Sequence, residues 1–85
     1  MSMARELIAA VMAAERNIDE QIAKLNAYAK QNDDIMSEIN QALDGSSHQS
    51  ASNMRQRLSQ TQSEITQTIR MLEASKEKLM RVRQI

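Results

Sequence analysis

Apolar and small residues recur along the first half of the chain in steps of three or four positions. This spacing places them on one face of an α-helix, and no proline interrupts the helix-forming residues around them. The pattern therefore predicts one helix from about residue 3 to about residue 44. Its stripe runs through Leu7, Val11, Ala14, Ile18, Ile22, Leu25, Ala29, Met36, Ile39 and Leu43, with Asn32 filling one position.

A second series predicts a second helix over about residues 51–83. Leu58, Ile65, Leu72 and Leu79 lie seven residues apart, and Ile69 widens the stripe that they form. The row that alternates with these residues along the helix consists of small polar residues with hydroxyl side chains. Such hydroxyls must find partners or face outward, so the row is weaker than a leucine zipper. Its members are Thr61, Thr68 and Ser75, and the whole series begins at Ala51 and Met54 and ends at Val82.

The turn motif Leu43, Asp44 and Gly45 separates the two predicted helices. Gly45 is the only glycine in the chain, and glycine suits the left-handed residue that ends a helix because it has no Cβ. The serines that follow, Ser46, Ser47 and Ser50, are candidate caps for the next helix. The chain is therefore predicted to reverse at residues 45–50 and to form an antiparallel hairpin.

A reversal near residue 47 also predicts which residues meet across the hairpin. Met36 would lie near Leu58, and Asn32 would lie near Thr61 and Gln62. One interpretation is a polar layer that fixes the register of an otherwise apolar seam. The other is that Asn32 faces solvent.

We therefore expect a single all-α domain over residues 1–85, an antiparallel two-helix hairpin that assembles into a four-helix bundle dimer. The predicted hairpin core also includes the turn residue Leu43; its other members are Leu7, Val11, Ile18, Ile22, Leu25, Met36, Ile39, Leu58, Ile65, Leu72 and Leu79. The apolar residues beside this stripe are the predicted partner interface, where flexible methionines adapt to varied contours. They are Ile8, Met12, Ile35, Ile69, Met71 and Met80. The alternative is that the methionines complete an ordinary homodimer core.

Composition strengthens the expectation of a partner. The 85 residues include one tyrosine and no tryptophan, phenylalanine or cysteine, so disulfides and cysteine-based zinc sites are excluded. A chain this small buries little surface by itself. The balanced total charge hides an asymmetry, because residues 1–44 hold four basic and eight acidic residues, a formal net of −4, whereas residues 45–85 hold seven and three, a net of +4. The two halves should attract each other.

Candidate chemistry is sparse, and we expect no catalytic residue, no metal site and no cofactor. His48 is the only histidine, and among its sequence neighbours only Asp44 could orient it. The carboxylate pairs at residues 19–20 and 33–34 lack the Glu-x-x-His motif of di-iron bundles. We interpret these acidic residues as a solvated face.

Nucleic-acid binding, membrane insertion and Sec-dependent export are also not expected. The chain is formally neutral and has no aromatic residues for base stacking beyond one tyrosine. No apolar run approaches the roughly 20 residues that span a bilayer. The N-terminal sequence "MSMARELIAAVMAAERN" has an apolar stretch cut short by Glu15 and Arg16, which is unlike a signal peptide.

Two helices of about 40 residues around a central x-x-Gly turn resemble the WXG family, the early-secreted-antigen-like hairpins of type VII secretion. Here Leu43-Asp44-Gly45 stands in the place of Trp-x-Gly, which is nearer to the turn of the LXG toxin-targeting domains. Family members carry Tyr-x-x-x-Asp/Glu after the second helix, whereas this chain ends "KLMRVRQI" and has its tyrosine, Tyr28, in the first helix. We therefore do not expect export on a signal of its own.

The resemblance implies a partner subunit, not an enzyme. Such hairpins pair with themselves or a related hairpin, or lie along the helical targeting domain of a toxin and help to present it for export. They work in the cytoplasm of Gram-positive bacteria before export. Two other functions stay open: a self-assembling secretion component similar to a type III needle subunit, and a coiled-coil adaptor or regulator of an enzyme or nucleic acid.

Overall fold

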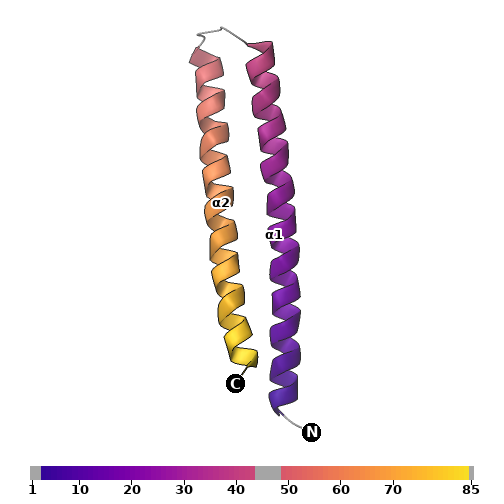
Figure 1. The fold of residues 1–85 in the computed structure, drawn as a ribbon. Coiled ribbons are helices and arrows are strands. Elements are labelled where there is room, and N and C mark those ends of the chain that lie inside the picture. Colours follow the sequence, from indigo (N-terminus) through magenta and orange to yellow (C-terminus); the bar gives the residue numbers. More distant parts are fainter. Residues whose placement is uncertain (1–2, 44–48, 85) are drawn as a thin grey trace.

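The protein is an all-α hairpin of two long helices (Figure 1). The computed structural model describes residues 3–43 and 49–84. Helix α1 spans Met3–Ala42 and helix α2 spans Gln49–Arg83. Leu43 extends the hydrogen-bonding pattern of α1 by one residue, since its amide donates to the Ile39 carbonyl over 2.9 Å. The predicted turn and cap residues Asp44 to Ser47, and His48, lie outside the described residues.

The hairpin is a thin rod. Its Cα extents are 67 × 15 × 14 Å and its radius of gyration is 19.3 Å, whereas a compact domain of this length has a radius of gyration of about 12 Å. Forty residues in one helix account for about 60 Å of this length at 1.5 Å per residue. Neither helix has a third element beside it in the described chain, so each covers only one stripe of the other.

The seam between α1 and α2 follows a strict heptad pattern. Its residues alternate in steps of four and three, the spacing of a and d positions in a coiled coil. All of these positions are buried or half-buried. In α1 they are Val11, Glu15, Ile18, Ile22, Leu25, Ala29, Asn32, Met36, Ile39 and Leu43, and in α2 they are Ala51, Arg55, Leu58, Gln62, Ile65, Ile69, Leu72, Lys76, Leu79 and Arg83.

The seam encloses very little. Among the described residues, the buried apolar side chains are Val11, Ile39 and Ala51, and no large side chain is fully buried. The remaining seam residues keep part of their surface in water because each touches only one neighbouring helix. Over residues 3–43 and 49–84 the hairpin therefore has a contact line between its helices but no enclosed hydrophobic core.

The alternate row predicted for α2 needs correction. Thr61, Thr68 and Ser75 are exposed, and the seam positions are the next residues along the chain, including Gln62, Ile69 and Lys76. Long polar side chains suit these positions because their aliphatic stems cover the seam while their polar ends reach its edge. The hydroxyl row lies beside the seam, so its hydroxyls do not have to be satisfied within it.

Leu7 and Ile69 also lie elsewhere than predicted. Leu7, expected in the hairpin core, is 54% exposed because α2 ends at Arg83, opposite Glu15, and α1 continues past that end (Figure 1). Ile69, expected at the partner interface, is half-buried in the seam. The other predicted interface residues lie off the seam: Met80 is half-buried, and Ile8, Met12, Ile35 and Met71 are exposed.

Candidate functional site

One edge of the seam carries a ladder of polar contacts between the helices. Arg55 Nε donates to Asn40 Oδ1 over 2.9 Å, and Gln62 Nε2 donates to Asp33 Oδ1 over 3.3 Å. Lys76 Nζ pairs with Asp19 Oδ1 over 2.7 Å. In every contact α2 supplies the donor from a seam position and α1 supplies the acceptor from the position next to its seam. We call this edge, defined by these six residues, the polar flank.

Asn32 forms a polar layer with Gln62, which is the first of the two interpretations that the sequence left open. Its amide nitrogen donates to the Leu58 carbonyl over 2.9 Å and to Gln62 Oε1 over 3.3 Å. The contact confirms that Asn32 and Gln62 face each other across the hairpin and excludes the interpretation in which Asn32 faces solvent. Because Gln62 also donates to Asp33, the layer is a continuous chain of hydrogen bonds from the seam to the polar flank.

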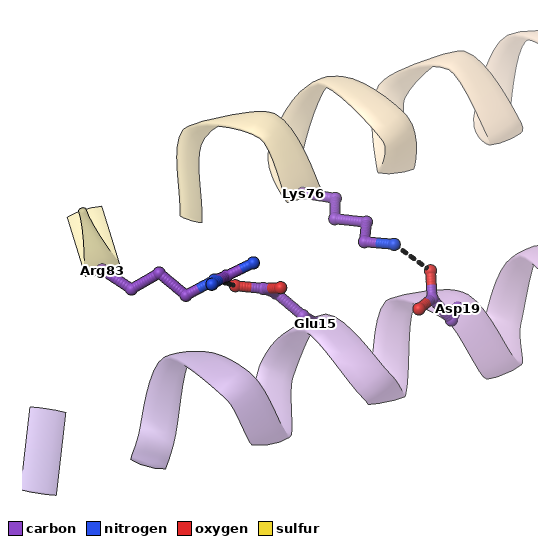
Figure 2. A network of polar contacts seen from close by, with 4 residues as sticks. All are labelled: Glu15, Asp19, Lys76 and Arg83. Carbon is purple, nitrogen blue, oxygen red and sulfur yellow. Dashed lines mark hydrogen bonds and ion pairs between the residues drawn. The ribbon is translucent and has the colours of Figure 1, made fainter. Parts of the chain in front are cut away.

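An ion pair ties the C-terminal end of α2 to α1. Arg83 Nε donates to Glu15 Oε1 over 2.6 Å, and Glu15 is 8% exposed (Figure 2). A carboxylate removed from water needs a charged or hydrogen-bonding partner. Asp19 and Lys76 form the next pair along the hairpin, and their side chains are 55% and 32% exposed (Figure 2). The two pairs thus differ mainly in how much water reaches them.

The opposite edge of the seam has a different character. In an antiparallel pair of helices the g positions of both heptads line one edge and the e positions line the other. The e positions include the acceptors of the polar flank. The g positions form what we call the uncharged flank: Leu7, Ala14, Gln21, Tyr28, Ile35 and Ala42 from α1, and Met54, Thr61, Thr68, Ser75 and Val82 from α2.

Exposed apolar side chains gather on the uncharged flank. Nine large apolar residues are exposed in the described chain, and five of them occupy g positions. Those five are Leu7, Tyr28, Ile35, Met54 and Val82, with exposed fractions from 39% to 60%. The flank therefore presents to water the kind of surface that a helix normally buries.

Two surface depressions lie along the described helices. The smaller, of about 270 Å³, contains the Asp19 and Lys76 ion pair and is lined by Asp19, Ile22, Glu73, Lys76, Glu77 and Met80. The larger, of about 410 Å³, lies along α2 and is lined by Ser59, Gln62, Ser63, Thr66, Gln67 and Arg70. None of these residues is a histidine or carboxylate that could act as a base for a hydroxyl nucleophile. Within residues 3–43 and 49–84 no cluster of three or more metal-ligating side chains occurs, and neither described helix is long and apolar enough to cross a membrane.

Comparison with known proteins identifies no relative. No family model matches the chain, and no curated protein or solved structure matches it significantly. The seam and its two flanks are the features of the hairpin that bear on its function.

Proposed function

We propose that this protein is a non-catalytic association subunit, a helical hairpin that functions by pairing with another hairpin or helical segment. The observation that carries the proposal is the imbalance between buried and exposed apolar side chains. The described residues include three buried apolar side chains and nine large exposed ones. A hairpin of this kind gains most of its stability by covering the exposed stripe with a further helical surface.

We propose that its partners are proteins of a type VII secretion system. The support is the architecture, two helices of 40 and 35 residues in antiparallel order, together with the Leu43-Asp44-Gly45 triplet between them. In this proposal the chain pairs with itself or a related WXG-like hairpin, or lies along the helical targeting domain of an LXG toxin. Its role is to stabilise and present that partner before export.

The first experiment is a light-scattering mass of the purified chain, with circular dichroism on the same sample. A strongly helical closed dimer, or a weakly helical monomer that gains helix when a partner is added, agrees with an association subunit. A fully helical and heat-stable monomer that gains nothing from any partner contradicts it, because its exposed apolar stripe would then need no cover.

The secretion assignment needs its own test. The chain is co-expressed with the helical targeting domain of an LXG toxin, and with an unrelated helical hairpin as control. We expect a stoichiometric complex and higher soluble yield of the toxin domain only in the first case. Open-ended filaments of the chain alone would instead point to a polymerising secretion component.

A further inference from the structure

We propose that the uncharged flank is a docking surface for a second copy of this chain, so that two hairpins pack flank to flank with α1 of each against α2 of the other. The inference deepens the proposed function and rests on it, because it names the surface and the occupant through which the hairpin associates.

The charge pattern around each helix distinguishes the uncharged flank from every other exposed row. Outside the seam, the g row is the only heptad row of α1 without a charged residue, and the same holds for the g row of α2. All eleven residues of the uncharged flank are apolar or neutral in a chain that holds 22 charged residues. The polar flank, by contrast, is closed by contacts such as Asp19 with Lys76. Only one edge of the seam is therefore free of charges that would have to be desolvated on docking.

The stripe of apolar and uncharged residues is wider than one neighbouring helix requires. A helix that packs against one partner needs apolar residues at a and d, whereas a helix in a bundle adds either e or g. Here the added row is g in both helices. Seven of the eleven residues in the two g rows are apolar or aromatic, five of them in α1, whereas α2 contributes Met54 and Val82 beside three hydroxyl residues. Of these hydroxyls, Thr68 Oγ1 donates to the Glu64 carbonyl of its own helix over 2.8 Å and leaves its methyl group available for packing. Each helix is therefore patterned for two neighbours, of which the hairpin supplies one.

The accessible surface area of the hairpin is larger than that of a compact monomer, as expected if a neighbouring hairpin is missing. The chain has 6782 Å² of accessible surface, whereas a compact monomer of 9.6 kDa exposes about 5,100 Å². A standard protein interface removes about 800 Å² from each partner. The hairpin therefore exposes ample surface for one interface of ordinary size.

Net charge favours a second copy as the occupant. Helix α1 holds seven acidic and four basic residues, and α2 holds three and seven. A two-fold axis parallel to the helices places α1 of one copy against α2 of the other, so every helix has neighbours of opposite net charge on both sides. The uncharged row itself gives no charge by which a strongly charged foreign surface could be selected.

The test compares two threonines of α2 that lie on opposite edges of the seam but have similar exposure and hydrogen bonding. Thr68 lies on the uncharged flank, whereas Thr66 lies at an e position on the other edge of the seam. Both are exposed, and both donate their hydroxyl to a carbonyl four residues earlier in α2. Lysine at either position keeps a good helix former there. The matched variants are therefore Thr68→Lys and Thr66→Lys, compared by light scattering and sedimentation over a dilution series.

We expect wild type to be dimeric, Thr68→Lys to raise the dimer dissociation constant by at least about tenfold, and Thr66→Lys to change it by less than about threefold. A second matched pair, Tyr28→Lys on the uncharged flank and Asn26→Lys on the other, repeats the comparison in α1. Circular dichroism of each variant shows whether the helices are retained. In wild type, Tyr28 is the only aromatic residue, so its fluorescence should change on dilution as the dimer dissociates.

The outcomes separate this inference from the proposed function. Equal effects of the paired variants, with wild type dimeric, refute the flank assignment but leave association intact. A wild-type monomer that pairs with a different helical protein refutes the second copy as occupant and retains the association role. A helical monomer that binds nothing overturns both.

Discussion

The ion pair between Glu15 and Arg83 provides a quantitative test of how water access sets the strength of the contacts between the helices. The perturbation is a double-mutant cycle: Glu15→Ala, Arg83→Ala and the double variant, beside the same cycle for Asp19 and Lys76. The two pairs belong to the same hairpin and have similar lengths, 2.6 Å and 2.7 Å. They differ in exposure, because the Glu15 side chain is 11% exposed and the Asp19 side chain 55% exposed.

The expected coupling energies follow from that difference. Removing one partner of a fully buried pair costs about 3–5 kcal/mol, whereas exposed pairs contribute about 0.2–1 kcal/mol. Arg83 retains 34% side-chain exposure, which places the Glu15 pair between these limits. We therefore expect a coupling energy of about 1–2 kcal/mol for Glu15 with Arg83 and no more than about 0.5 kcal/mol for Asp19 with Lys76.

The assay is urea unfolding followed by circular dichroism at one fixed protein concentration, because association would otherwise shift the apparent stability. The cycle removes effects that each alanine has by itself. Raising the salt concentration to about 1 M shortens the screening length to about 3 Å, so the Asp19 pair should lose its coupling while the Glu15 pair keeps most of its own. Equal couplings, or equal salt sensitivity, would show that burial does not distinguish the two pairs.

Substitutions at three seam positions, with Met71 as an exposed control, are compared by the same unfolding assay. Ile39→Ala should cost about 2–4 kcal/mol because Ile39 is 9% exposed, whereas Met71→Ala, at a position 71% exposed, should cost less than about 0.5 kcal/mol; similar losses would contradict the burial pattern. Asn32→Ala should destabilise by about 1–2 kcal/mol through its lost hydrogen bonds, whereas Asn32→Leu should lie within about 1 kcal/mol of wild type because apolar burial offsets that loss. A neutral alanine variant would mean that the Asn32 layer contributes nothing. Ala51→Leu should cost about 1–3 kcal/mol, since Ala51 is 1% exposed and has no room for a larger side chain; a gain in stability would reveal an unfilled space there.

The helices and their pairing could be predicted from the sequence because the signals are local and repeated. The spacing of Leu58, Ile65 and Leu72 fixes one row of α2, and the lone glycine indicates the reversal. The other seam row of α2, which contains Gln62, could not be predicted from the spacing of apolar residues. A scan for apolar and small residues favours Thr61 over Gln62, whereas the structure uses Gln62, whose polar end has a partner on the other helix.

The surfaces beside the seam were also harder to predict, because they too depend on residues of the other helix. Whether Lys76 belongs to the seam depends on Asp19, which lies 57 residues away in the chain, and no single-helix pattern contains that information. Leu7 has the correct spacing for the stripe, and its exposure follows only from where α2 ends. The uncharged flank becomes visible once the heptad frames of both helices are fixed, because only then do the g rows lie on one edge.

The polar contacts between the helices also imply an order of folding. Arg55 and Asn40 are 15 residues apart in the chain, Gln62 and Asp33 are 29 apart, and Arg83 and Glu15 are 68 apart. Closing a longer loop costs more entropy, so contacts near the chain reversal form first. Each contact then lowers the entropic cost of closing the next one. The hairpin should therefore close like a zipper toward the termini, with the Glu15 and Arg83 contact the last to form and the first to open.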